Sequence, residues 1–284
     1  MDTGGRGRRL TPPNRGAGSS VAYARFGASR TRDPTRDSTR DSGSVVDAQY
    51  WQEKWAGDRI GFHQTRINRR LEEHWSALEV PAETPVFVPL CGKSLDMLWL
   101  HERGHPVLGI ELSEKAVRAF FDENDLPHER CAEGRFERFS GTGRATGLEL
   151  LVGDFFALPP PALAHVGAFY DRASLIAMDG TLRGRYARHL AKLLPAGCRG
   201  LLLAIDYDPA RMDGPPFAVP DPLVHDLLGE AFDIEELAHY SGAARQHGLA
   251  ERGLDTLEER VYRLRRAVGG EPPPRPPRLA PSAG

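Results

Sequence analysis

Between about residue 45 and residue 268, short apolar runs alternate with stretches in which apolar residues recur every three or four positions. The first pattern predicts buried strands and the second predicts amphipathic helices. The predicted strands are 86–90, 107–111, 148–152, 166–170 and 200–207, and the predicted helices are 94–102, 113–124, 182–194 and 223–232. Strands that alternate with helices are typical of an α/β fold, in which a mostly parallel sheet is covered on both faces.

The pattern changes character at both ends of this region. Two more strand candidates, 234–239 and 256–263, follow the last helix and are expected to pair antiparallel at one edge. Ahead of the first strand we expect a short helix that carries Trp51 and Trp55, a loop over 57–64, and a second helix over 67–78. The Gly- and charge-rich stretch 129–147 is expected to be an irregular excursion on the surface.

The two ends of the chain contain too few apolar residues to form a hydrophobic core. Residues 1–44 are rich in Gly, Arg and Ser and contain a tandem Thr-Arg-Asp repeat, and residues 269–284 are rich in Pro. Such segments bury too little apolar surface to offset their ordering entropy, so both are expected to be disordered tails around a domain at 45–268. An organelle transit peptide, or a translation start near Val45, are the alternatives for the first segment.

Charge and cysteine content narrow the class of partner. The formal net charge of −2 divides into about +5 on residues 1–42 and about −7 on the rest, and a core of that sign is a poor match for nucleic acid. No apolar run approaches the roughly 20 residues of a membrane helix. Three widely spaced cysteines without metal-ligand spacing fit reduced thiols. We therefore expect a cytoplasmic monomer that binds a small molecule, without a metal, membrane or nucleic-acid partner.

A turn and an acidic residue carry the clearest chemistry. Gly92 follows the first predicted strand, and Glu111 ends the second one, 19 residues later. In α/β folds, a glycine at the first turn lets the backbone approach a cofactor, and an acid after the next strand accepts hydrogen bonds from the ribose hydroxyls. The pair therefore predicts a nucleotide-like cofactor, although Glu111 could instead be a solvated strand end.

The same turn excludes two common phosphate-binding motifs. A P-loop needs a glycine five residues before Gly92, and that position is Phe87. The three-glycine dinucleotide fingerprint is absent as well, which disfavours a nicotinamide or flavin enzyme. S-adenosylmethionine fits what is left, because it offers a ribose for Glu111 and no phosphate group.

Further candidates lie near the carboxyl ends of the predicted strands. Asp154 and Phe155 follow the third strand, where an acid and an apolar neighbour can contact an adenine, or simply form a turn. Trp51 and Trp55 are either core residues or a lid whose indole faces attract a sulfonium cation. Arg172 follows the fourth strand, where its cation can stabilise a substrate thiolate or pair with an acid.

Two reactive side chains have weaker claims. His63 is either a general base or a residue that merely lines the site, and the second interpretation is favoured. Cys91 could be a nucleophile, but no base is visibly paired with it, and a small buried residue beside the cofactor explains it as well.

Together these segments resemble the thiopurine S-methyltransferase family, in its bacterial branch. The matching stretches occur in the family's order across about 47–265: Trp51 to Trp55, Gly61 to Gln64, Val88 to Ser94, Gly109 to Ser113, Tyr170 to Arg172, and Gly214 to Phe217. The resemblance implies a class I, Rossmann-like methyltransferase fold with a mostly parallel seven-stranded sheet and S-adenosylmethionine as cofactor.

The resemblance also implies roles for individual residues. It places Trp51, Leu90, Glu111 and Arg172 in contact with the cofactor, with Trp55 beside it. It brings Asp154 and Phe155 to the adenine and puts Phe62 beside an aromatic thiol substrate. By an ambiguous local alignment, it matches a second substrate-binding arginine of the family to Arg245.

The predicted reaction is methyl transfer from S-adenosylmethionine to the sulfur of an aromatic or heterocyclic thiol, with Arg172 as the catalytic residue. Selenium or tellurium species and small thiols are alternative acceptors. A non-catalytic protein that binds S-adenosylmethionine and a nicotinamide oxidoreductase are the alternatives from other classes.

Overall fold

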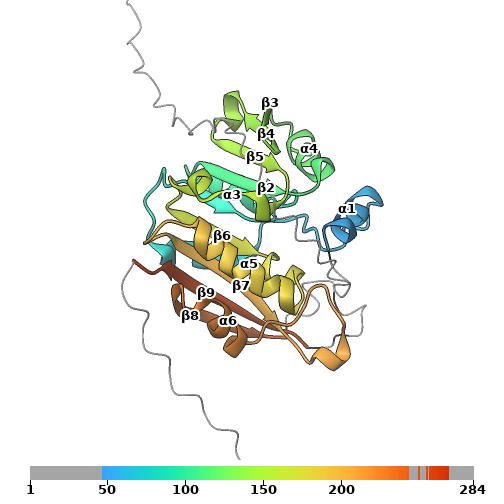
Figure 1. The fold of residues 1–284 in the computed structure, drawn as a ribbon, viewed down its shortest axis with the longest axis vertical. Coiled ribbons are helices and arrows are strands. Elements are labelled where there is room, and N and C mark those ends of the chain that lie inside the picture. The colour runs from blue at the N-terminus through green and yellow to red at the C-terminus, as the bar shows by residue number, and fades with distance from the viewer. Residues whose placement is uncertain (1–46, 243–248, 250–253, 255, 269–284) are drawn as a thin grey trace, which may run out of the picture.

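The fold of the computed structural model is a three-layer α/β arrangement around one sheet (Figure 1). The structure describes residues 47–242, 249, 254 and 256–268. The sheet has nine strands in the order β3-β4-β5-β2-β1-β6-β7-β9-β8. Its strands are β1 (Val86–Val88), β2 (Val107–Glu111), β3 (His128–Glu133), β4 (Phe136–Gly141), β5 (Leu148–Val152), β6 (Ala168–Arg172), β7 (Arg199–Asp206), β8 (Phe232–Ser241) and β9 (Glu258–Arg266).

The centre of the sheet is parallel and both edges are antiparallel. Strands β5, β2, β1, β6 and β7 pair parallel to one another in that order. The β8–β9 hairpin joins β7 antiparallel, as the sequence predicts. Parallel strands end at one edge, so the residues that follow β1, β2, β5 and β6 gather there.

The sheet has one hairpin more than the seven strands that the sequence predicts. The stretch 129–147, expected to be irregular, forms β3 and β4, and β4 pairs antiparallel with β5. Only Phe139 is buried in these two strands, so the period-2 apolar pattern that identifies a strand is missing from the sequence. The hairpin extends the edge of the sheet away from the site.

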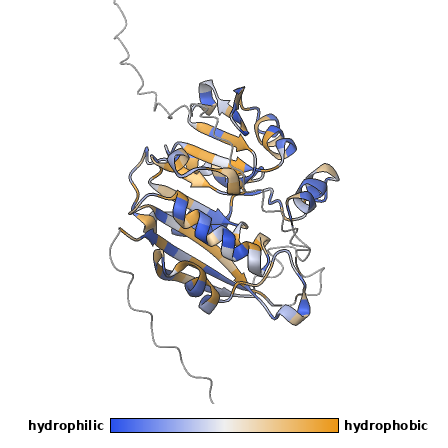
Figure 2. Ribbon diagram, in the orientation of Figure 1, coloured by the Kyte–Doolittle hydropathy of each residue, from blue (hydrophilic) through white to orange (hydrophobic). Residues whose placement is uncertain are grey.

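Helices cover both faces of the sheet. The α-helices are α1 (Ala48–Ala56), α2 (Arg69–His74), α3 (Asp96–Glu102), α4 (Glu114–Glu123), α5 (Gly180–Leu193) and α6 (Asp221–Leu228). Side chains alternate in β1: Phe87 packs into the core under α5 and α6, while Val86 and Val88 pack into the core under α2, α3 and α4. Figure 2 shows the apolar central strands between helices whose outer faces are polar.

Local sequence explains where several helices begin. Ser113 accepts a hydrogen bond from the Ala116 N–H, as an N-cap of α4, and Asn68 does the same for α2 through the Arg70 N–H. The single helix expected over 67–78 is instead α2 followed by a 3₁₀ helix, Trp75–Leu78. None of the helices among the described residues has the length and hydropathy of a membrane span.

The short helix α1 stands apart from the sheet and contacts α4 (Figure 1). Asp47 caps its first turn by accepting from the Tyr50 N–H. At its other end, Lys115 on α4 lies 2.7 Å from a carboxylate oxygen of Asp58 and 3.5 Å from the Ala56 carbonyl. This contact holds the two tryptophans of α1 near the turn that follows β1.

Candidate cofactor and acceptor site

Glu111 is buried at the carboxyl end of β2, with 6% of its surface exposed. One carboxylate oxygen accepts the Gly92 N–H and the other accepts the Ser113 N–H, each at 2.9 Å. Burial raises the pKa of this carboxyl, and the backbone N–H groups of Ser113, Gly92 and Leu112 oppose that rise. The two carboxylate oxygens together have four acceptor sites, so these backbone donors leave capacity for a further donor.

The turn after β1 is built from residues in the left-handed backbone region. Leu90 has φ 45° and Gly92 has φ 53°. For a residue with a branched side chain such as Leu90 this conformation stores strain, on the order of 1–3 kcal/mol, which is typical of ligand-binding turns. At Gly92 an added Cβ would lie 3.2 Å from Cζ2 of Trp55, so the glycine also lets that indole pack on the backbone.

Three aromatic residues that were predicted separately form one cluster over this turn. Phe62 packs edge-on against Trp51 and Trp55, with ring centroids 5.4 Å and 5.6 Å apart. Trp55 is buried, whereas Phe62 is 41% exposed. The cluster is therefore an apolar wall, closed at Gly92 and open at Phe62.

Arg172, the last residue of β6, reaches the same loop from the other side. Its Nη2 donates to the Ser94 hydroxyl at 3.1 Å. Its Nε lies 2.9 Å from Oδ2 of Asp96, although the N–H does not point along that line, so the contact is an ion pair rather than a directed hydrogen bond. The alternative that Arg172 pairs with an acid is thus confirmed, and the acid is Asp96 rather than the neighbouring Asp171.

The two reactive side chains are held in their neutral forms. Burial lowers the pKa of His63 from 6.5, and the nearby cations of Lys93 and Arg172 act in the same direction. Burial raises the pKa of the Cys91 thiol well above 9.0, and the Glu111 carboxylate raises it further. A protonated, buried thiol is a poor nucleophile, which agrees with the interpretation of Cys91 as a packing residue.

The two residues expected at the adenine are placed differently from each other. Asp154 is exposed, and its carboxylate accepts the Phe156 N–H at 2.9 Å. The ring of Phe155 is buried in the core, where it packs on Phe87 and Tyr186. A side-chain contact between Phe155 and a ligand is therefore excluded in this conformation, and only its backbone remains available. Arg245 lies outside the described residues.

The loop after β7 forms a rigid border near this edge. Gly214, at φ 77°, leaves space for the Phe217 ring, which an added Cβ would approach to 2.4 Å. The Tyr207 hydroxyl donates to the Pro216 carbonyl at 2.6 Å, and the Phe217 N–H donates to the Ile176 carbonyl at 2.7 Å. These bonds fix the predicted Gly-Pro-Pro-Phe segment against the ends of β7 and β6.

Sequence reasoning missed Asp96 and gave no role to Tyr170. Asp96 is 1% exposed and accepts a hydrogen bond from the Tyr170 hydroxyl at 3.1 Å. It shares the buried stripe of α3 with Trp99 and Leu100, three and four residues later. An acid on an apolar helix face needs a cation partner, and this pattern could have identified it.

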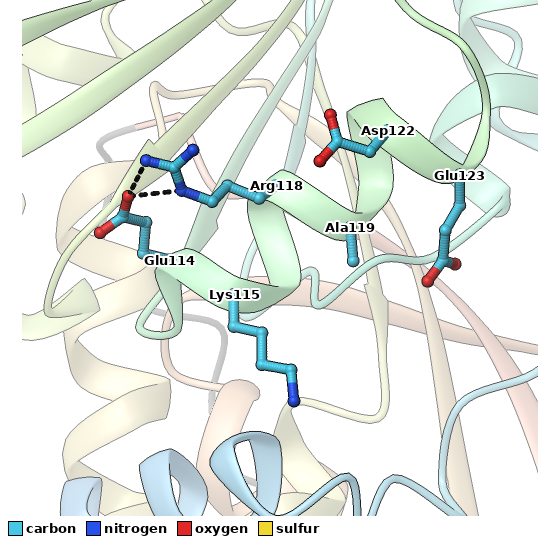
Figure 3. A pocket seen from close by; sticks show the side chains of 6 residues that line it. All are labelled: Glu114, Lys115, Arg118, Ala119, Asp122 and Glu123. Carbon is cyan, nitrogen blue, oxygen red and sulfur yellow. Dashed lines mark hydrogen bonds and ion pairs between the residues drawn. The ribbon is translucent and has the colours of Figure 1, made fainter.

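An open hollow on the outward face of α4 has the wrong chemistry for this site. It is lined by Glu114, Lys115, Arg118, Ala119, Asp122 and Glu123, and Glu114 bonds to Arg118 within it (Figure 3). These are charged side chains of one helix, of which Glu114 and Arg118 pair with each other while Lys115 and Glu123 pair with Asp58 and Lys93 outside it. Glu123 also binds Lys93 on the back of the β1 turn, so the hollow borders the site without sharing its aromatic wall.

The residues at the carboxyl edge fit S-adenosylmethionine. Glu111 has acceptor capacity left for a ribose hydroxyl, Gly92 adds no side chain of its own at the positive-φ turn, and the indoles suit a sulfonium. Fold and site together define the class of S-adenosylmethionine-dependent methyltransferases.

Comparison with solved structures supports this fold. Burkholderia thailandensis 1,6-didemethyltoxoflavin-N1-methyltransferase, solved with S-adenosylhomocysteine, has a TM-score of 0.51 at 15% identity, covering 78% of this chain and 87% of its own. The N-methyltransferase NodS from Bradyrhizobium japonicum, also with S-adenosylhomocysteine, has a TM-score of 0.51 at 13% identity, covering 77% and 97%.

Sequence comparison identifies the particular family. The family model described as Thiopurine S-methyltransferase matches residues 46–267. Thiopurine S-methyltransferase of Azotobacter vinelandii is 49% identical over 76% of this chain and 98% of its own length, and that of Pseudomonas fluorescens is 47% identical over 78% and 99%. The chain belongs to the thiopurine S-methyltransferase family. The predicted family, fold class and cofactor are thereby confirmed.

Proposed function

We propose that this protein transfers a methyl group from S-adenosylmethionine to the sulfur of an aromatic or heterocyclic thiol. The observation that carries the proposal is the aromatic cluster of Trp51, Trp55 and Phe62, packed on Gly92 of the turn that Glu111 holds. It supplies an apolar aromatic surface for an aromatic acceptor beside the cofactor turn. The substrate named in the relatives, a thiopurine, has this shape.

Each residue contributes through binding and orientation. Glu111 would accept the ribose hydroxyls, while Leu90, Gly92 and the indole of Trp51 would border the cofactor. When bound, S-adenosylmethionine supplies an electrophilic methyl group bonded to a cationic sulfur. Asp154 and the backbone of Phe155 would lie at the adenine end, and Trp55 would close the turn.

The acceptor half has to exclude water and hold a sulfur close to the methyl group. Reacting atoms must approach to about 3–3.5 Å in line, and a dry site favours an anionic nucleophile that loses its charge. Phe62 and the two indoles provide the apolar wall, and the guanidinium of Arg172 would stabilise the thiolate. Burial lowers the pKa of His63 and so makes its imidazole a weaker base, and an acidic thiol is the acceptor that this site suits.

The remaining expectations belong to the same proposal. The methyltransferase domain would span 45–268, and the protein would act in the cytoplasm as a monomer on a small molecule, without nucleic acid. Arg245 would be a second substrate-binding residue.

Ligand-dependent melting with S-adenosylhomocysteine and with NAD, followed by turnover assays on a thiopurine, tests the function. We expect S-adenosylhomocysteine alone to raise the melting temperature and the thiopurine to be methylated at sulfur. Stabilisation by S-adenosylhomocysteine without turnover on any thiol would favour the non-catalytic alternative, and stabilisation by NAD alone would favour an oxidoreductase.

A further inference from the structure

Asp96 contacts three segments around the acceptor half of the site, the half formed by Phe62 and Arg172. It lies in the first turn of α3 and is almost fully buried. Its Oδ1 accepts the Asn68 N–H at 2.7 Å. Its Oδ2 accepts the Tyr170 hydroxyl at 3.1 Å and lies 2.9 Å from Nε of Arg172. One carboxylate thus contacts the segment before α2, the middle of β6 and the end of β6.

The contact with Arg172 restricts the plane of the guanidinium. Asp96 faces Nε, and Ser94 accepts from Nη2, so two sides of a rigid, planar group are anchored on the same loop. The side chain of Arg172 is 15% exposed, which leaves part of it open to the site. Without Asp96, the guanidinium of Arg172 would lose its anionic partner and keep its hydrogen bond to Ser94.

The contact with Asn68 fixes the other wall of the site. Asn68 begins α2, and its side chain donates to Gln64 at 3.4 Å, two residues after Phe62. The position of the Phe62 segment relative to Arg172 is therefore set through Asp96. A buried charge pair is a weak source of stability, but its best-attested use is to fix one arrangement of the groups around it.

We propose that Asp96 is a positioning residue, which holds the guanidinium of Arg172 and the Phe62 segment in the geometry that an acceptor thiol requires. This role rests on the proposed methyl transfer to sulfur. It assigns to Asp96 a larger effect on acceptor binding and turnover than on cofactor binding, in which Glu111 has the main role.

Two substitutions separate position from charge. Asp96→Asn keeps the shape and removes the anion, and Asp96→Glu keeps the anion and moves it by one methylene. For both we expect kcat/KM for a thiopurine to fall about 10- to 100-fold, the size expected from a misplaced group. We expect the Kd for S-adenosylhomocysteine, measured by calorimetry, to stay within about threefold of wild type. Wild-type turnover in Asp96→Glu would show that only charge balance matters and would overturn the proposal.

A matched control removes a carboxylate from another buried ion pair. Glu259 on β9 lies 2.8 Å from Nε of Arg70, and both side chains are buried, with 4% of the Glu259 side chain and 7% of the Arg70 side chain exposed. We expect Glu259→Gln to lower kcat/KM by less than about threefold. A loss equal to that of Asp96→Asn would indicate general destabilisation and contradict the proposal.

A double-mutant cycle tests whether Asp96 acts through Arg172. In an Arg172→Ala background we expect Asp96→Asn to lower kcat/KM further by less than about threefold. The guanidinium that Asp96 positions is already absent in that background. Losses that multiply would overturn the proposal. Where turnover of the variants is too slow to measure, the Kd of the thiol for the S-adenosylhomocysteine complex gives the same comparison.

The proposed function fails separately from this inference. A wild-type protein that neither methylates nor binds any thiol in its S-adenosylhomocysteine complex would contradict both. Wild-type turnover with both Asp96 variants equally active would contradict the role of Asp96 alone.

Discussion

Glu111 at the end of β2 and Asp96 at the start of α3 are both buried carboxylates, yet their partners differ. Glu111 is held by backbone N–H groups, and among the described residues no cation pairs with it. Asp96 has a cation, a tyrosine hydroxyl and a backbone N–H around it. The first carboxylate therefore retains acceptor capacity, while the second uses most of its capacity within the protein.

The difference indicates which carboxylate is exposed to a ligand and which supports the site. Burial raises the pKa of Glu111 because its backbone donors compensate for lost water only in part. Ribose hydroxyls would supply the missing hydrogen bonds. Asp96 instead balances the charge of Arg172, so its contribution to a ligand is indirect.

Glu111→Ala should have the largest effect, because it removes the carboxylate that is assigned to the cofactor. Loss of two hydrogen bonds from ligand hydroxyls to a charged group should raise the Kd for S-adenosylhomocysteine by about 100-fold or more. Isothermal titration calorimetry measures this Kd directly. Glu123→Ala is the control, since Glu123 binds Lys93 on the same loop with its side chain 54% exposed. An unchanged Kd in Glu111→Ala would refute the ribose assignment.

Arg172→Ala should have its main effect on turnover. Removing the guanidinium takes away thiolate stabilisation, and we expect kcat/KM for the thiol to fall about 10- to 100-fold. Because Asp96 then keeps a buried charge without its cation, the free energy of unfolding should also fall, by about 3 kcal/mol. Steady-state kinetics and urea unfolding measure the two effects. A variant that loses affinity for S-adenosylhomocysteine while keeping kcat would assign Arg172 to cofactor binding rather than to the acceptor, and would contradict this prediction.

Gly92→Ala should disturb the packing of Trp55 on the turn after β1, which is the turn proposed to bind the cofactor. Gly92 has φ 53°, and the new Cβ would lie 3.2 Å from the indole, so both backbone strain and a displaced ring are expected. Gly104→Ala is a matched control, because Gly104 has φ 88° and no atom within 4 Å of the added Cβ. Each variant should lose about 1 kcal/mol of stability, the usual size of this strain.

Only Gly92→Ala should also weaken S-adenosylhomocysteine binding, about five- to tenfold in Kd, which corresponds to about 1 kcal/mol. Calorimetry on both variants gives the comparison. Equal Kd values would mean that the contact between Trp55 and Gly92 does not support the cofactor turn.

The sequence predicted those parts of the molecule that depend on local pattern. Strands β2 and β5 lie at the residues expected, and Gly92 and Glu111 are joined as expected because adjacent parallel strands end at one edge. The β3–β4 hairpin was missed because its exposed, charged strands lack alternation.

The partner of Arg172 could not be predicted for a different reason. Asp96 and Arg172 are 76 residues apart in the sequence, and their contact depends on the parallel pairing of β1 with β6. The core position of the Phe155 ring likewise depends on α5, which supplies Tyr186. Such long-range contacts have no local pattern to identify them.

The smallest expected effect concerns His105, a buried imidazole remote from both carboxylates. Its Nε2 accepts the Trp75 indole N–H at 3.2 Å, so Nδ1 carries the proton and faces the Thr84 carbonyl at 3.0 Å. Burial lowers the pKa of His105 from 6.5, and a second proton could bind only at the nitrogen that already accepts.

The unfolded state therefore binds more protons on His105 than the folded state does, and stability should be full above about pH 6.5 and decline below it. At pH 5.5 we expect a lower free energy of unfolding than at pH 7.5, by at most about 1 kcal/mol from this group, measured by urea unfolding at both values. His105→Gln should be less stable at pH 7.5 but lose that much less on acidification. The remaining pH dependence would then come from the other titrating groups, His63 beside the site among them. Identical pH dependence in the variant and the wild type would show that His105 is protonated equally in both states.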